Sequence, residues 1–434
     1  MAKSPKKVLI VSYYWLPHSG TGSYRISKIV KYLIKLGWEP VILTPGKTTI
    51  GFNEAKIDSI YQNVKIYQTK IIEPTFFFKS KANTSQNMAN TLLLLRNDLS
   101  LKQRFIRWVR LNIFIPDAKI LWKRFAVAKG KEVIKKEKPD IILSTSPPPT
   151  AHLVARSLAK WSKLHWVADF RDPWTNIFYY EQLKINPISR KINKALEKKV
   201  LDAADRIVTV SDGFFPEHDY SSKTIRIENG YDPEDLPEVN TTASKNEKFT
   251  ISYIGSLKTN QFFKNFFEVL KELTKDEEFQ KKLKFEIAGY MDPSIRDYLN
   301  REVKNLEINI QGYLPHSEAI RQMSEADLLI LAIGKGKQSK NVISTKIFEY
   351  LMVRKPILAF GPSCGAANRI LQETNAGKMF DYNDYIALRQ YLLEIYSDWS
   401  QGKKPINDIK NAEKYNFQNL TIRLKNVFEQ YLGN

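Results

Sequence analysis

The sequence predicts an α/β protein with two Rossmann-like, doubly wound domains facing a central cleft. Strand-like apolar runs alternate with amphipathic helical segments along most of the chain, as in β-α-β units with parallel sheets. The alternation stops once, at the polar stretch 229–248, and then resumes. A chain of 434 residues is also longer than one hydrophobic core usually organises.

The first half supplies five apolar runs and three helical segments. The expected strands are 7–15, 38–45, 140–149, 165–174 and 206–213, and the expected helices are 23–37, 150–162 and 189–204. The second half supplies strands at 249–255, 284–290, 308–315, 326–334 and 355–362, and a final helix at 418–432. We expect domains at 1–235 and 249–410, with residues 411–434 forming a helix that packs back toward the first domain.

Composition excludes several classes of protein. With 43% hydrophobic and 12% aromatic residues, the chain is not disordered. A single cysteine, Cys364, excludes an internal disulfide and fits a reducing compartment. No apolar run approaches the ~18 residues of a membrane span. The start, "MAKSPKKVLIVSYYWLP", resembles a signal peptide but lacks a cleavage site and leads into a glycine loop, so we interpret it as a buried strand. The net charge of +21 favours an anionic partner such as nucleic acid, acidic lipid or a phosphorylated small molecule.

The loop "PHSGTGSYR" (17–25) places Gly20 and Gly22 ahead of a helix, where backbone N–H groups can approach an anion. A dinucleotide fingerprint would need glycine in place of Arg25 and an acidic residue after the second strand, so NAD binding is not expected. A tight turn without a ligand is the alternative.

Two further motifs follow strands of the first half. "STSPPPTAH" (144–152) cannot continue a sheet, because prolines lack the N–H donor, and is expected to form a rigid loop. "VADFRDPW" (167–174) places Asp169, Arg171 and Asp172 at a strand end, where charges need partners. These three residues either form an internal Arg–Asp clamp or provide a polar wall that contacts a sugar or its leaving group.

The second half has corresponding loops. Gly255 ends a strand and is followed by Lys258 and Lys264, while "AIGKGKQSKNVISTK" (332–346) brings lysines, Lys337 and Lys340 among them, to a helix start. The latter is not a Walker loop, because the glycine spacing and the Ser or Thr after lysine are missing. Ser344 and Thr345 are expected to cap the helix, whose N–H groups would face a diphosphate together with Lys346.

Glu349 stands within the apolar segment "IFEYL". A capping box would need Ser or Thr at position 346, which is Lys346. The remaining alternatives are a first-turn glutamate favoured by the helix dipole and a ligand contact. HExxH, CxxC and a convincing Ser-His-Asp series are absent from the sequence, so we expect no metal site.

The order of these motifs resembles the GT-B glycosyltransferases, specifically the retaining family 4. The resemblance spans nearly the whole chain and rests on the Gly20–Gly22 loop and on seven segments: "PDIILSTSPPPTAHL", "WVADFRDPW", "RIVTVSDG", "IENGYD", "YIGSL", "GYLP" and "STKIFEYLMVRKPILA". It implies an acceptor-binding first domain, a nucleotide-sugar-binding second domain, and no cofactor beyond the nucleotide-diphosphate sugar.

The resemblance also implies roles for individual residues. Glu349 matches the second Glu of the family's E-x7-E element, which binds ribose hydroxyls, whereas Asn341 replaces the first, which contacts the donor sugar. Lys258 or Lys264 takes the place of an arginine that relatives carry after Gly255. Tyr313 and Leu314, of "GYLP", join the nucleotide-binding set with Gly20, Gly22, Ser344 and Thr345. The catalytic set is Asp169, Arg171, Asp172 and Lys346, with Arg171-Asp172 in place of the family's His-Asp.

The expected reaction is therefore retaining transfer to a sugar or polyprenyl-diphosphate-linked acceptor in bacterial surface-polysaccharide assembly. An essential divalent metal and a nucleic-acid partner are not expected. Alternatives are a GT-B nucleotide-sugar epimerase, a basic nucleic-acid-binding protein and an inactive relative.

The basic stretch 101–138 predicts a cytoplasmic protein docked on the inner membrane face. It holds twelve Lys or Arg against three acids, interleaved with Phe105, Trp108, Phe114, Trp122 and Phe125. The alternative is that these aromatics pack the helices onto their own sheet.

Overall fold

The computed structural model describes residues 4–18, 20–46, 58–72, 100–177, 180–217, 219–236, 247–336, 338–403 and 409–433. The chain divides into two compact units, 1–228 with 417–434 and 229–416. The boundaries predicted at 235 and 410 therefore shift, because residues 229–235 and 411–416 belong to the second unit.

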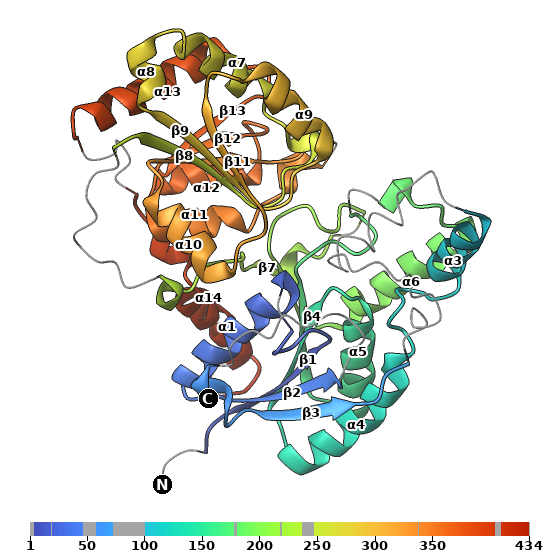
Figure 1. Cartoon of the computed structure of the whole chain (residues 1–434). Coiled ribbons are helices and arrows are strands. Elements are labelled where there is room, and N and C mark those ends of the chain that lie inside the picture. Colours follow the sequence, from blue (N-terminus) through green and yellow to red (C-terminus); the bar gives the residue numbers. More distant parts are fainter. Residues whose placement is uncertain are drawn as a thin grey trace. The chain divides into compact units, whose positions relative to one another are not determined.

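The first unit is built on a seven-stranded parallel sheet (Figure 1). Its order is β3-β2-β1-β4-β5-β6-β7. The strands are β1 (Lys7–Ser12), β2 (Glu39–Pro45), β3 (Lys65–Thr69), β4 (Ile141–Ser146), β5 (His165–Phe170), β6 (Arg206–Thr209) and β7 (Thr224–Arg226). The helices are α1 (Thr21–Lys35), α3 (Leu101–Asn112), α4 (Trp122–Glu137), α5 (Thr150–Ser162), α6 (Pro187–Ala203) and α14 (Phe417–Glu429).

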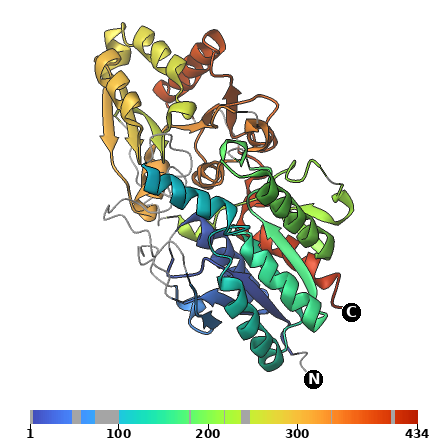
Figure 2. The same cartoon turned by 90° about the vertical axis from the view of Figure 1, so that its right-hand side faces the viewer.

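Alternate residues of the central strands supply two cores. Val8 and Ile10 of β1 belong to a cluster with α1 and α14, whereas Leu9 and Val11 belong to a cluster with α4, α5 and α6. Figure 1 shows α14, from the end of the chain, beside α1, from its beginning. Figure 2 shows α4 and α5 side by side on the opposite face. Both faces of the sheet are therefore covered, as expected of a doubly wound domain.

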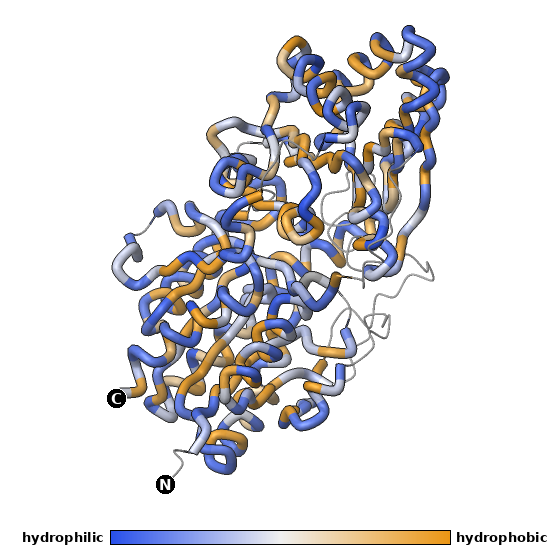
Figure 3. Tube along the Cα trace, turned by 90° about the vertical axis from the view of Figure 1, so that its left-hand side faces the viewer, coloured by the Kyte–Doolittle hydropathy of each residue, from blue (hydrophilic) through white to orange (hydrophobic). Residues whose placement is uncertain are grey.

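The second unit has a six-stranded parallel sheet of order β10-β9-β8-β11-β12-β13. The strands are β8 (Phe249–Ile254), β9 (Leu283–Ala288), β10 (Glu307–Gln311), β11 (Leu328–Ala332), β12 (Ile357–Phe360) and β13 (Gly377–Phe380). The helices are α7 (Lys264–Leu273), α8 (Glu277–Lys281), α9 (Pro293–Glu302), α10 (His316–Glu325), α11 (Lys346–Val353), α12 (Ala366–Thr374) and α13 (Ile386–Ser400). One core packs α7, α9 and α13 on the sheet, and another packs α10, α11 and α12. Figure 3 shows stretches of apolar residues, in orange, in each unit.

The fold class predicted from the sequence is confirmed: two Rossmann-like domains with mixed helices and parallel strands. All ten predicted strands are present in at least part of their length. Three short strands at or near sheet edges, β3, β7 and β13, were not predicted.

Candidate active site

In the second unit the strand order reverses between β8 and β11. Ligands of doubly wound sheets bind beyond the carboxyl ends of the strands at such a point. The loops that follow the two strands contact each other directly. The Lys335 N–H donates to the Asn260 carbonyl at 2.9 Å, and the Gln261 amide donates to the Ala332 carbonyl at 3.4 Å.

Gly255 lies at the centre of this edge in a conformation that favours glycine. Its φ is +121°, and a Cβ there would lie 2.4 Å from Cε of Lys346. Gly289, after the neighbouring β9, has φ +119°, and its Cβ would meet the Gly255 carbonyl at 2.6 Å. The two glycines allow the chains to turn at close range and leave room for the lysine.

Lys346, the first residue of α11, extends across Gly255. Its Nζ donates to the Tyr253 hydroxyl at 3.0 Å and lies 4.2 Å from the centroid of that ring, a cation–π distance. The Tyr253 hydroxyl donates in turn to the Ser256 carbonyl at 2.8 Å. Burial lowers the pKa of Lys346 to about 8, and the Glu349 carboxylate opposes this shift. The protein thus holds a partly desolvated cation at the strand ends.

The start of α11 differs from the prediction. Thr345 is the N-cap residue, but its side chain makes no capping hydrogen bond. The reason is local, since Thr345 has helical dihedrals (φ −59°, ψ −26°), whereas a side-chain cap normally needs an extended N-cap residue. Tight backbone turns from Ser344 and Thr345 to Ile347 and Phe348 replace it, at 3.2 and 3.1 Å.

Glu349 pairs with a residue that the sequence analysis missed. One of its carboxylate oxygens lies 3.0 Å from Nε2 of His316, the first residue of α10. The Glu349 side chain is 21% exposed and the His316 side chain 49% exposed. Glu349 also lies in the first turn of α11, so the dipole interpretation remains compatible with the structure. The only signal in the sequence was the position of His316 directly after "GYLP".

The other residues of this unit that were predicted to bind the nucleotide sugar differ in their surroundings. Lys258 and Asn341 are exposed, and Tyr313 is 80% exposed. Leu314 packs against the second core of the unit. Lys264 points to α9, with Nζ 5.6 Å from the Tyr298 ring. Lys337 lies outside the described residues.

In the first unit, Asp169 forms a buried clamp. Its carboxylate accepts from Nη2 of Arg25 at 3.0 Å and from the Thr145 hydroxyl at 2.7 Å, and both charged side chains are at most 3% exposed. Arg25 also donates to the carbonyls of Ile227 and Glu228. The geometry matches the internal Arg–Asp clamp, but the arginine that pairs with Asp169 is Arg25 and not the nearby Arg171.

Arg171 fixes loops. Its guanidinium donates to the Ser146 carbonyl at 3.0 Å, to the Pro147 carbonyl at 2.8 Å and to the Gly22 carbonyl. Burial lowers its pKa. The proline loop and the start of α1 are thereby joined. Asp172 is exposed to solvent, although partial desolvation raises the pKa of its carboxyl. Of the predicted catalytic residues in this unit, Asp172 is the accessible one.

The predicted glycine loop opens α1 as expected from its spacing. Gly20 is the N-cap residue with φ +138°, and a Cβ on Gly22 would lie 2.8 Å from the Tyr14 ring. The backbone conformation therefore explains the glycine at position 20, and close packing explains the glycine at position 22. Anion binding at this loop stays a prediction.

The described residues offer neither a metal site nor a membrane-spanning helix. Among them, no group of three or more His, Cys, Asp or Glu side chains is placed to hold a metal ion. Within the same ranges no helix combines the length and apolarity needed to cross a membrane.

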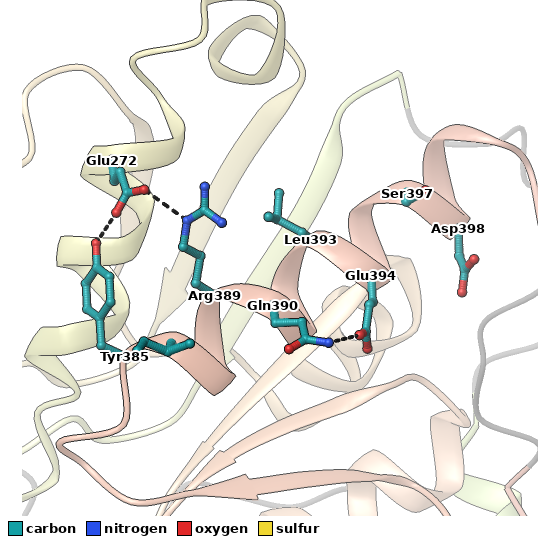
Figure 4. Close-up of a pocket in the computed structure, with 9 residues that line it drawn as sticks. Glu272, Tyr385, Arg389, Gln390, Leu393, Glu394, Ser397 and Asp398 are labelled. Atoms are coloured by element: carbon teal, nitrogen blue, oxygen red, sulfur yellow. Dashed lines mark hydrogen bonds and ion pairs between the residues drawn. The ribbon is translucent and has the colours of Figure 1, made fainter.

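A surface hollow lies apart from the strand ends, between α7 and α13 (Figure 4). Its charged groups are already paired: Glu272 accepts from the Tyr385 hydroxyl and from Arg389 at 2.9 Å, and Gln390 donates to Glu394 at 3.0 Å. None of the predicted site residues lines it.

Residues 248–398, most of the second unit, match the family described as glycosyl transferases group 1. No curated protein sequence matches the chain.

Solved structures match over nearly the whole length. Sucrose-phosphate synthase of Thermosynechococcus elongatus is 12% identical with a TM-score of 0.61, covering 98% of both chains. Anabaena HepE in complex with UDP is 11% identical with a TM-score of 0.59, covering 97% of this chain and 99% of that one. WaaG, a glycosyltransferase involved in lipopolysaccharide biosynthesis, is 11% identical with a TM-score of 0.53 at the same coverage.

At such identities these likenesses define the fold, which is GT-B. The Gly255–Lys346 edge lies inside the residues that match the glycosyl transferases group 1 family.

Proposed function

We propose that the protein is a retaining glycosyltransferase that moves a sugar from a nucleotide-diphosphate sugar to a sugar or polyprenyl-diphosphate-linked acceptor in cell-surface polysaccharide biosynthesis. The observation that carries this proposal is the Lys346 ammonium, held across Gly255 at the carboxyl edge of a group 1 domain. Among the similar structures, Anabaena HepE is in complex with UDP, and WaaG is involved in lipopolysaccharide biosynthesis.

The chemistry follows from where charge develops. When the bond between the sugar C1 and the diphosphate oxygen breaks, negative charge grows on the terminal phosphate. A cation fixed beside that phosphate stabilises the transition state more than the ground state. Lys346 supplies this charge, and the N–H groups at the start of α11 add to it.

The remaining residues position the donor and acceptor. The Glu349 carboxylate accepts hydrogen bonds from the ribose hydroxyls, in competition with His316. The acceptor oxygen bonds to C1 on the face that the diphosphate leaves, and its proton passes to a leaving-phosphate oxygen, so the anomeric configuration is retained. Asp172 faces solvent at the strand ends of the first unit, where an acceptor hydroxyl would bind.

A nucleotide screen tests the proposal. UDP, GDP, ADP and CMP are compared by thermal shift, since a ligand of the folded state raises the melting temperature by mass action. We expect one nucleoside diphosphate to stabilise the protein and Lys346→Ala to reduce that effect. Lys378→Ala removes a lysine 5.4 Å from the Phe380 ring, and serves as the matched control.

Product analysis then separates the enzyme classes. With the identified donor, the NMR spectrum of the product should show the anomeric configuration of the donor. Conversion of the donor without any acceptor would indicate an epimerase instead. Binding of DNA that falls steeply with salt, without binding of any nucleoside diphosphate, would indicate a nucleic-acid-binding protein.

We further propose that the protein works on the inner face of the cell membrane as a peripheral protein. The proposal is supported by the basic stretch 101–138 and by the lipid-linked acceptor that the resemblance implies.

A further inference from the structure

Helix α3 exposes three of its large apolar side chains, although its buried residues, Arg107 and Asn112, are polar. Its outward stripe at i, i+4 and i+7 is apolar: Leu101 is 81% exposed, Phe105 65% and Trp108 48%. An amphipathic surface helix normally shows the opposite arrangement.

The first turns of α6 extend this apolar face. Ile188 is 73% exposed and Ile192 43% exposed, one turn apart on the helix. Ile113, at the end of α3, is 58% exposed. Six of the thirteen exposed large hydrophobic residues in the described ranges therefore lie on these two elements. Large exposed apolar patches of this kind mark interaction sites.

Buried hydrogen bonds hold the two helices together. The Asn186 N–H donates to the Asn112 side-chain carbonyl at 2.7 Å, and the Ser189 hydroxyl donates to the Asn112 backbone carbonyl at 3.1 Å. Asn112 and Ser189 are at most 8% exposed. These contacts place the end of α3 beside the beginning of α6 (Figure 1), and we call the exposed side chains of these two segments the α3–α6 face.

The charge of the α3–α6 face selects its partner. Residues 100–116 and 182–196 contain eight Lys or Arg and no Asp or Glu. Lys102, Arg104, Lys184 and Lys191 are exposed in the same two segments. A second copy of this chain would bring like charges together, and aliphatic side chains add nothing to phosphate recognition in nucleic acid. Basic residues beside Trp and aliphatic side chains fit the headgroup boundary of an anionic bilayer.

We propose that the α3–α6 face binds an anionic lipid bilayer, with α3 lying in the interfacial plane. This proposal identifies the surface that would hold the protein at the membrane. It does not depend on the proposed transfer reaction. It also corrects the interpretation of residues 101–138 as one docking segment. Trp122 of α4 is fully buried and donates to Thr69 at 2.7 Å, so α4 packs on its own sheet, and Arg107 is buried.

Sedimentation of the full chain with vesicles tests the proposal. Vesicles of pure phosphatidylcholine are compared with equimolar phosphatidylcholine and phosphatidylglycerol, at low and high salt. Binding should require the anionic lipid and fall with salt. Lys102→Glu with Arg104→Glu should weaken binding by at least about 25-fold, at about fivefold for each charge removed from an anionic surface.

Two apolar variants test the rest of the surface. Phe105→Ala with Trp108→Ala should weaken binding by about tenfold or more, and Ile188→Ser with Ile192→Ser should also weaken it. Lys160→Glu with Lys304→Glu, and Trp161→Ala with Ile386→Ala, make the same kinds of change elsewhere on the surface and should leave binding unchanged. All these side chains are exposed, so the melting temperatures should stay close to wild type.

Three outcomes would overturn the proposal. The first is absence of binding to the anionic vesicles at low salt. The second is binding that the α3 or the α6 variants do not weaken beyond the controls. The third is self-association of the wild type that the Phe105 and Trp108 changes abolish, which would make the face an interface between copies. Nucleotide thermal shifts on the same preparations report the donor site separately, so failure of one proposal is distinguishable from failure of the other.

Discussion

Replacement of Lys346 by methionine should stabilise the protein while it removes nucleotide binding. In the folded protein burial lowers the pKa of this lysine from 10.5 to about 8. At about 1.36 kcal/mol per pKa unit, holding the charge at neutral pH costs roughly 3 kcal/mol. Methionine removes that cost but also loses the cation–π contact with Tyr253, worth ~1 kcal/mol. The net gain is then roughly 2 kcal/mol at pH 7.

The sign of the pH dependence follows from the same pKa. Between pH 8 and 10.5 the unfolded chain holds a proton on Lys346 that the folded chain has lost. The free energy of unfolding of the wild type should therefore rise across this interval as the cost of the buried charge disappears. The Lys346→Met variant should lack this rise, so its advantage over wild type should be largest below pH 8.

Urea unfolding at pH 7 and pH 10 measures both effects, and calorimetry measures nucleotide binding. Binding itself should weaken about tenfold from pH 7 to pH 9, because the charged fraction of a lysine with pKa about 8 falls by that factor. Lys378→Met, a change at an exposed lysine over Phe380, is the control for stability. A Lys346→Met protein that is less stable than wild type and still binds the nucleoside diphosphate would refute the reasoning.

Three other variants test separate parts of the structure. Glu349→Gln should retain the fold and weaken nucleoside diphosphate binding by roughly tenfold to a hundredfold, since a hydrogen bond to a charged acceptor is worth ~1.5–3 kcal/mol; equal calorimetric affinity would reject the ribose contact. Arg25→Met should destabilise the protein by ~3–5 kcal/mol in urea, because it leaves Asp169 as an uncompensated buried charge. Adding Asp169→Leu to this variant should recover most of the lost stability. Absence of any recovery would argue against the Arg25–Asp169 ion pair as the cause. Burial lowers the pKa of His152 to about 3, so wild-type stability should fall by about 1.4 kcal/mol per pH unit from pH 6.5 down toward pH 3. His152→Gln should flatten that slope, and an equally steep slope in the variant would reject the assignment.

The elements that could be predicted from the sequence are those buried on both faces. Such strands read as apolar runs, and β1 and β11 do so over most or all of their length. The missed strands are shorter or more polar. β3 exposes most of its residues, β7 has three residues, and β13 begins with a glycine. Their pairing depends on a neighbouring strand that is distant in sequence, which a local pattern does not encode.

The same limit applies to the candidate site. Lys346 and Glu349 were identified because charges inside an apolar segment conflict with the local pattern. Arg25 did not stand out, because an arginine in an amphipathic helix is ordinary, yet its carboxylate partner lies 144 residues away. His316 and Tyr253 were missed for a related reason, since each acquires its role only when loops from different strands meet.

The two units use charge at their strand ends for different purposes, and this difference bears on where the ligand binds. In the first unit Arg171 donates to three carbonyls, and Asp169 forms an ion pair with Arg25. These charged groups therefore already have protein partners, which they hold in place. In the second unit, within the described residues, the Lys346 ammonium donates one hydrogen bond, to a neutral phenol, although it has three donors. A desolvated cation without a full set of acceptors raises the free energy of the unliganded protein. Binding of an anion beside the cation removes this cost. Because a purely structural lysine would be more stable in a saturated environment, the retained cost at Lys346 supports the second unit as the one that binds the phosphorylated donor.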